Sequence, residues 1–181
     1  MYDVDFDVAH QILSPNQLDW TNGTAEFHGL SIKTVGHSHQ LKFTTDVNIP
    51  GGSYFLSENI HVTTGPPFAL RVIEEQGLSE VFGGKAFVRQ PLLHIVDAGG
   101  NIVESDSTSR VVASIYNNPI TNGESVLHPS SSTIVKAEKG VVRFKSLSIA
   151  QAAKLYRLKY WIQNTNITVV GEWNNVIFLG V

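Results

Sequence analysis

The fold is decided by a ten-residue stretch, Gly140-Val-Val-Arg-Phe-Lys-Ser-Leu-Ser-Ile149. A related stretch occurs earlier in the chain, Gly23-Thr-Ala-Glu-Phe-His-Gly-Leu-Ser-Ile32, and the likeness continues downstream, where Leu158-Lys-Tyr160 matches Leu41-Lys-Phe43. The matched residues lie 117 positions apart throughout, with no insertion or deletion. Because a repeat of that length is a whole domain and not one turn of a solenoid, we interpret the chain as a tandem repeat.

The repeat also predicts the domain boundaries. Asn59 lies 117 residues before Val176, so the first copy ends near Thr64, and residues 65–181 have the length of one period. A stiff joint containing two prolines, Thr64-Gly-Pro-Pro67, stands between the copies. Residues 1–64 match only the second half of the period. We therefore expect a complete module at 65–181 and, at 1–64, the C-terminal half of another.

Apolar residues alternate with a period of two along most of the chain, and helical periodicity is nearly absent. This pattern predicts short β-strands at residues 68–73, 91–97, 110–116, 132–136, 141–147, 155–162, 167–170 and 176–179. Seven or more such strands at close spacing are typical of an antiparallel β-sandwich. The side chains expected between its two sheets are Leu70, Leu93, Ile95, Val112, Ile115, Phe144, Leu147, Tyr156, Leu158 and Ile177.

The composition excludes several classes of protein. A hydrophobic content of 42% with 16% charged residues is that of an ordinary globular chain that can bury a core. The 13 basic residues are scattered and the net charge is −3, so we expect no nucleic-acid partner. No apolar run is long enough to span a membrane, and the acidic N-terminus is unlike a signal peptide. We expect a soluble fragment without membrane insertion.

The chain contains no cysteine, which excludes disulfides, thiolate metal sites and cysteine nucleophiles. Two Asn-x-Thr triplets make Asn22 and Asn166 candidate N-glycosylation sites. These triplets favour an extracellular or cell-surface glycoprotein.

A family resemblance rests on the string from Gln90 to Asn101, Gln-Pro-Leu-Leu-His-Ile-Val-Asp-Ala-Gly-Gly-Asn, together with Gly140 to Ile149 and Tyr156-Arg-Leu-Lys-Tyr160. These segments resemble the Ig-like repeats of large cell-surface and secreted proteins, of which the invasin and intimin adhesins carry relatives. The resemblance covers residues 65–181 well and 20–64 partly. It implies an all-β, tandem Ig-like antiparallel β-sandwich, with one complete seven-stranded module preceded by a partial one. Such modules act as spacers or adhesion units and generally lack catalytic residues.

Two motifs in this region have a structural interpretation. Asp97 and Asn101 are placed to cap a turn whose glycines adopt positive φ. A calcium site using these two residues with Glu104 and Asp106 is the alternative, but calcium needs six or more oxygens and the segment offers too few. Tyr156 resembles the corner tyrosine of sandwich domains, whose hydroxyl ties down a loop.

Catalytic and metal chemistry find little support in the sequence. His37 and His39 would share one face of a regular strand and could hold zinc with a third ligand, but their counterparts one period later are Lys154 and Tyr156, which favours surface histidines. No nucleophile elbow and no pair of carboxylates flanking a cleft is recognisable. We expect no enzyme activity, no metal and no cofactor.

Two functional classes stay open. The first is a non-catalytic extracellular Ig-like module of a larger surface or secreted protein, acting as a spacer or as an adhesion and protein-interaction unit. The second is an accessory carbohydrate- or protein-binding domain of a secreted enzyme, with Trp20, Trp161 and Trp173 as a candidate binding surface. Tryptophans gathered on one surface would favour the second class.

The N-terminal half-module predicts a protein partner. An apolar face is expected from Phe27, Leu30, Ile32, Leu41 and Phe43. A half sandwich leaves such a face and its strand edges uncovered. We expect a neighbouring module or another chain to complete residues 1–64, and a glycan is the other candidate partner.

Overall fold

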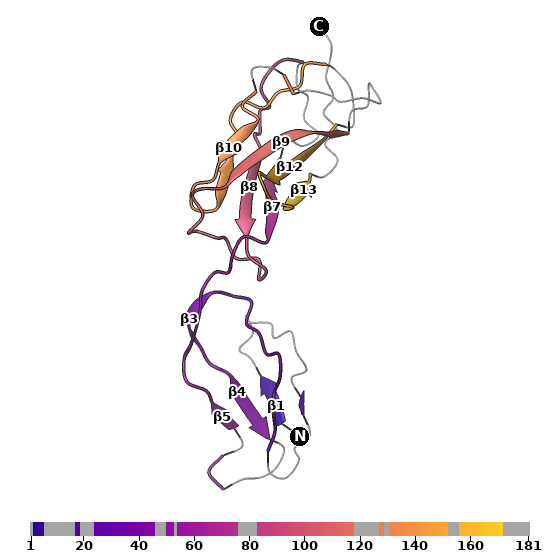
Figure 1. Cartoon of the computed structure of the whole chain (residues 1–181). Helices are drawn as coiled ribbons and strands as arrows, with labels where there is room; N and C mark the ends of the chain where they lie inside the picture. Colours follow the sequence, from indigo (N-terminus) through magenta and orange to yellow (C-terminus); the bar gives the residue numbers. More distant parts are fainter. Residues whose placement is uncertain are drawn as a thin grey trace. The chain divides into compact units, whose positions relative to one another are not determined.

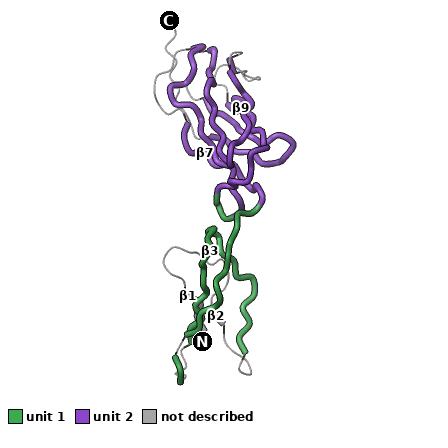
Figure 2. The backbone as a smooth tube through the Cα atoms, turned by 90° about the vertical axis from the view of Figure 1, so that its left-hand side faces the viewer, with its two compact units in different colours: residues 1–65, 99–101 green, residues 66–98, 102–181 purple. Residues whose placement is uncertain are grey.

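The structure, a computed structural model, describes residues 2–5, 17–18, 24–45, 50–52, 54–75, 83–117, 127–128, 131–151 and 156–171. They form two compact units (Figure 2). Unit 1 comprises residues 1–65 and 99–101, and unit 2 comprises residues 66–98 and 102–181. Between β6 (Ile60–Val62) and β7 (Ala69–Glu74) no strand covers residues 63–68, where Pro66, Pro67 and Phe68 are exposed.

The fold of unit 2 is an antiparallel β-sandwich, as the period-two pattern predicts. One sheet has the order β10-β9-β12-β13 and the other the order β11-β8-β7 (Figure 1). Within the described residues these seven strands are β7 (Ala69–Glu74), β8 (Leu92–Val96), β9 (Arg110–Asn117), β10 (Ile134–Lys136), β11 (Val141–Arg143), β12 (Arg157–Ile162) and β13 (Thr168–Val170). The all-β class is therefore confirmed.

The core of unit 2 lies between these two sheets. Seven of the predicted core residues are buried: Leu70, Leu93, Ile95, Phe144, Leu147, Tyr156 and Leu158. Ile115 is partly buried against this core, and Ile177 lies outside the described residues. The prediction for Val112 is wrong, because the residues of β9 that point inward are Val111 and Ala113. Strand alternation then places Val112 on the outer face.

The Gln90-Pro91 pair has a backbone role in this sandwich. The Phe144 amide donates to the Pro91 carbonyl, at 3.0 Å, but proline has no N–H to return. The side chain of Gln90 replaces the missing pairing, because its Oε1 accepts from the Leu147 amide at 2.9 Å and its Nε2 donates to the Leu147 carbonyl at 3.1 Å. The strand expected over residues 141–147 therefore ends at Arg143.

The glycine that opens the repeated stretch makes a tight turn. Gly140 has a φ of 73° and follows Lys139, whose φ is 50°. A Cβ at Gly140 would lie 2.7 Å from the carbonyl oxygen of Val103, so a side chain there would collide with backbone. Glycine meets both constraints, since it adopts positive φ without steric cost.

Unit 1 contains a four-stranded antiparallel sheet whose pairing resembles that of one sheet in unit 2. Its four-stranded sheet has the order β2-β1-β4-β5, built from β1 (Tyr2–Asp5), β2 (Gln17–Leu18), β4 (Lys42–Thr45) and β5 (Tyr54–Leu56). The pairings are antiparallel, as they are in the order β10-β9-β12-β13 of unit 2. A separate two-stranded sheet joins β3 (Gly36–His39) to β6 (Ile60–Val62). No pair of described strands in unit 1 corresponds to β7 and β8.

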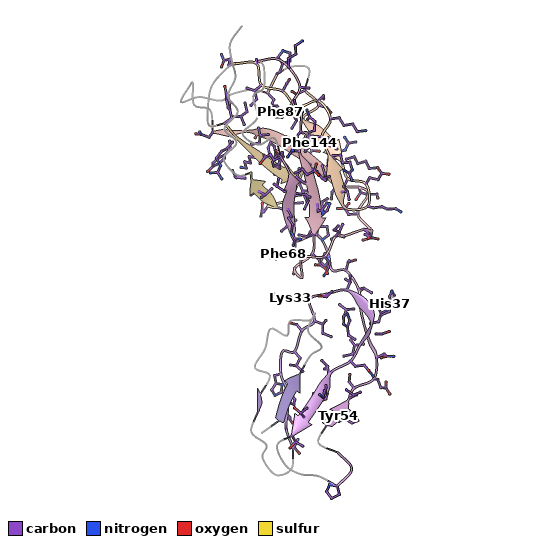
Figure 3. All side chains as sticks on the ribbon, turned by 180° about the vertical axis from the view of Figure 1, so that it is seen from behind. Lys33, His37, Tyr54, Phe68, Phe87 and Phe144 are labelled. Atoms are coloured by element: carbon purple, nitrogen blue, oxygen red, sulfur yellow. The ribbon has the colours of Figure 1, made fainter. Side chains whose placement is uncertain are left out.

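Replacing Phe144 by alanine tests the core. Phe144 is 2% exposed and lies between the strands of unit 2 (Figure 3). We expect Phe144→Ala to lower the free energy of unfolding by about 3–5 kcal/mol, the usual cost of emptying a buried aromatic position. Phe68→Ala, at a position 66% exposed, is the control and should change it little. A loss below about 1 kcal/mol for Phe144→Ala in chemical denaturation would contradict this packing.

Candidate functional site

The outer face of the sheet β10-β9-β12-β13 carries Trp161. On β12 the residues Leu158, Tyr160 and Ile162 are buried, so Trp161 and Lys159 point outward. Trp161 is paired with Val112 on β9 and with Thr168 on β13, and Lys159 is paired with Ser114 and Val170. Directly opposed residues share a face of the sheet. The register therefore brings an indole, an ammonium group and two hydroxyls together.

An open cavity of about 380 Å³ lies on this outer face, and it is lined by Ser114, Lys159, Trp161, Thr165, Asn166 and Thr168. The Lys159 Nζ lies 6.0 Å from the centroid of the Trp161 ring, within the range of a cation–π contact. Two of the hydroxyls hold the turn after β12: Thr165 donates to the Ile162 carbonyl and Thr168 donates to the Tyr160 carbonyl. The cavity thus combines one aromatic wall, one cation and neutral polar groups.

Of the other predicted site residues, the structure describes Asn166. Trp20, Trp173 and Asn22 lie outside the described residues, so a surface formed by the three tryptophans stays a prediction. Asn166 is exposed in the turn between β12 and β13, on the cavity that Trp161 lines. Trp161 and Asn166 were predicted for separate reasons, whereas their neighbours Ser114, Lys159, Thr165 and Thr168 were not predicted from the sequence. The pairing register of β12 with β9 and β13 was needed to find them.

The five apolar residues predicted to form the open face of unit 1 are all only half-buried: Phe27, Leu30, Ile32, Leu41 and Phe43. Their counterparts one period later in unit 2 are between 0% and 3% exposed: Phe144, Leu147, Ile149, Leu158 and Tyr160. The aromatic contact itself recurs, since the ring centroids are 5.5 Å apart for Phe27 and Phe43 and 5.8 Å for Phe144 and Tyr160. The two aromatic pairs therefore make a similar ring contact, but the pair in unit 2 is buried and the pair in unit 1 is only half-buried.

Strand β5 extends this apolar face to an edge of the sheet in unit 1. Phe55 is paired with Phe43, with ring centroids 6.4 Å apart, and is 68% exposed. Its neighbours on β5, Tyr54 (labelled in Figure 3) and Leu56, are exposed as well. An edge strand with exposed apolar side chains is a template for pairing with another chain. Among residues 24–45, 50–52, 54–65 and 99–101 of unit 1, no apolar side chain is buried and His39 is the one buried residue.

The histidines do not form a metal site among the described residues. His37 is exposed and its ring lies 4.1 Å from that of His61, whereas His39 is buried. The expectation that all of these histidines lie on the surface is therefore wrong for His39. The physical reason is an irregularity in the pairing of β3 with β6 between Gly36 and His39, which turns the His39 ring inward over Gly36. In the described ranges, no group of three or more His, Asp or Glu residues could hold a metal ion.

Asp106, one of the acidic residues weighed for calcium, has a structural role. Gly100, in the turn after Asp97, has a φ of 87°, as expected of a glycine in that turn. Asp106 is buried, and its Oδ1 accepts hydrogen bonds from the amides of Thr108 and Ser109 at 3.0 and 2.9 Å. Burial raises the pKa of Asp106, but the bonds from Ser109 and Thr108 outweigh it and hold the pKa below its ordinary value.

Two buried tyrosines tie loops to the sandwich. Tyr156 donates its hydroxyl to the Gln151 carbonyl at 3.1 Å, which confirms the predicted corner tyrosine, and burial raises its pKa. Tyr160 donates to Glu75 Oε1 at 2.7 Å. Burial, and then the Glu75 carboxylate, raise the pKa of Tyr160 well above its ordinary value. Gly171 leaves room for this carboxylate, since a Cβ there would collide with both oxygens of Glu75.

Comparison with known proteins identifies no family. No protein-family model matches the chain, and no curated protein matches it. Two solved structures of glycosyl hydrolase family 2 members from Bacteroides cellulosilyticus are similar in part. The first, from strain DSM 14838, has 15% identity and a TM-score of 0.41 over 83% of this chain and 22% of that one. The second has 16% identity and a TM-score of 0.40 over 83% of this chain and 20% of that one. The chain thus spans about a fifth of their length.

The Tyr160–Glu75 hydrogen bond predicts loss of stability in alkali. The unfolded chain releases the Tyr160 proton near pH 10, whereas the folded chain keeps it because the folded pKa is raised. The contribution of protonated Tyr160 to the free energy of unfolding is therefore fully present below about pH 10. It is lost as the pH rises above that value. In urea titrations at increasing pH, Tyr160→Phe should show a shallower alkaline loss than the unchanged protein. Tyr116→Phe, at an exposed position, should not; equal slopes for both variants would contradict the role of Tyr160.

Proposed function

We propose that the chain is a non-catalytic β-sandwich module of a larger secreted or cell-surface protein, with unit 2 as a spacer and interaction unit. Unit 1 is then the second part of a similar module, and strands from a neighbouring module or from another chain complete it. The observation that carries the proposal is the difference in burial at equivalent positions. Phe144 and Tyr160 are covered in unit 2, and Phe27 and Phe43 are half-exposed in unit 1.

The strand orders support this proposal. In unit 2 the inner face of β10-β9-β12-β13 is covered by the second sheet, which contains β7 and β8. The described residues of unit 1 contain the equivalent of the first sheet and no equivalent of β7 and β8. Apolar surface left in water costs about 25 cal/mol per Å². A partner that covers Phe27, Phe43 and Phe55 would therefore bind favourably.

The chemistry of the partner follows from the strands that the described part of unit 1 lacks. A pair of antiparallel strands whose inward side chains are apolar, as Leu70 on β7 and Leu93 and Ile95 on β8 are, fits the uncovered face. Phe43 stands where unit 2 has Tyr160, whose hydroxyl donates to Glu75 near the end of β7. Because phenylalanine has no hydroxyl, the partner needs no acceptor at this position.

The remaining parts of the proposal rest on fewer residues. The extracellular location is supported by the exposure of Asn166, which leaves its glycosylation triplet accessible. The non-catalytic character rests on the sequence, in which neither a nucleophile elbow nor a carboxylate pair flanking a cleft was recognisable. None of the described residues forms a helix that is long and apolar enough to cross a membrane.

Removing the apolar face of unit 1 tests the proposal. We expect the 181-residue chain to self-associate with increasing concentration, or to bind a dye that reports exposed apolar surface, because the face of unit 1 lacks cover. Phe55→Lys should reduce both signals, since a charge on an edge strand opposes pairing. Size-exclusion chromatography with light scattering and dye fluorescence measure the two effects.

The matched control is Val88→Lys, which places the same charge at an apolar position of unit 2 that is 82% exposed. It should leave association and dye binding unchanged. A monodisperse chain that binds no dye, unfolds in one cooperative step and protects Phe27 and Phe43 from solvent would show that unit 1 closes on itself. That result would overturn the proposal.

A further inference from the structure

The outer face of the sheet β10-β9-β12-β13 has an unusual distribution of charge. Its four strands contain four cations, Lys136, Arg110, Arg157 and Lys159, and no Asp or Glu. Lys136 is paired with Arg110, and both are exposed. The whole chain has a net charge of −3, so this basic face does not follow from its composition. A local excess of positive charge attracts anionic ligands.

Two aromatic residues stand among these cations. Trp161 lies beside Lys159, and the Arg157 guanidinium carbon lies 5.6 Å from the centroid of the exposed Tyr116 ring. Arg157 is held in place, because its Nε and Nη2 donate to the Gly171 carbonyl at 3.1 and 3.0 Å. Residues 157 and 161 are four apart on one strand, roughly 13 Å at 3.3 Å per residue. The face therefore offers an extended surface with an aromatic group toward each end.

The neutral polar groups of the cavity complete the surface. Ser114 and Asn166 line the cavity with neutral polar side chains, which can bond ligand hydroxyls. Sugar rings present hydroxyls around their rim and an apolar C–H face that stacks on aromatic rings such as indole. None of the six residues that line the cavity is acidic, so a ligand carboxylate meets no opposing charge there.

From these features we infer that the outer face of β10-β9-β12-β13 is a binding site for an anionic oligosaccharide. A sugar ring stacks on Trp161 in the cavity, Ser114 and the unglycosylated Asn166 bond its hydroxyls, and Lys159 pairs with its carboxylate or sulfate. The chain of sugars runs along β12 toward Arg157 and Tyr116. The site lies wholly in unit 2, so it does not depend on the proposed completion of unit 1.

Matched ligands separate the contributions of charge and ring. Oligogalacturonate carries both carboxylates and sugar rings, its methyl ester carries the rings alone, and poly-glutamate carries carboxylates alone. Isothermal titration calorimetry with the full chain should show saturable binding of oligogalacturonate, weaker binding of the ester and none of poly-glutamate. Equal binding of poly-glutamate or of single-stranded DNA would show a nonspecific basic surface and overturn the inference. So would the absence of binding to both oligogalacturonate and a sulfated oligosaccharide.

Variants locate the site. Trp161→Ala should weaken oligogalacturonate binding about tenfold or more, the scale of a central aromatic contact. Lys159→Gln should weaken binding of the acid and leave binding of the ester unchanged. The controls are Lys145→Gln and Phe68→Ala, exposed positions outside this sheet, which should bind as the unchanged chain does.

If Trp161→Ala does not fold, two other measurements still test the inference. Trp161→Phe keeps an aromatic ring and should retain part of the affinity. In the unchanged chain, the Trp161 indole N–H signal should shift during titration with oligogalacturonate, as seen by NMR. A signal that does not move, or unchanged affinity in both tryptophan variants, would overturn the inference.

Discussion

The packing of Phe144 against Tyr160 between two sheets is the contact on which the sandwich of unit 2 depends. A β-sheet with one apolar face is stable in water only when another layer covers that face. In unit 2 the cover is the sheet that contains β7 and β8, and both aromatic residues are buried. Two hydrogen-bonding side chains lie around this contact. Gln90 accepts a hydrogen bond from the Leu147 amide next to Pro91, which has no N–H to donate, and Glu75 accepts a hydrogen bond from the Tyr160 hydroxyl.

Unit 1 contains the same contact without the same cover. Phe27 and Phe43 lie as close together as Phe144 and Tyr160 do, which indicates that the local chain path is set by the repeated residues themselves. The burial of these rings depends on a second sheet, whose strands come from other parts of the sequence. The described residues of unit 1 lack a second layer, so the aromatic pair is intact but only partly covered. This is the surface that we propose is completed by a neighbouring module or another chain.

The two faces of the sheet β10-β9-β12-β13 differ in chemistry. The inner face is apolar and needs strands to cover it, whereas the outer face in unit 2 is basic, aromatic and hydroxylated. Strand alternation separates the two sets, since Tyr160 points into the core and its neighbours Lys159 and Trp161 point outward. A single strand, β12, thus contributes both to the stability of the sandwich and to the candidate oligosaccharide site.

The sequence by itself determined the all-β class, the positions of most strands in unit 2, and the burial of Phe144 and Tyr156. These features depend on local alternation and on comparison within the chain. Only the tertiary structure decided that Val112 points outward, that His39 is buried, and that Ser114, Thr165 and Thr168 join Trp161 and Lys159 around one cavity. The reason is that alternation gives the faces of a strand only relative to one another, whereas pairing register and local irregularities decide which face points inward and which distant residues meet.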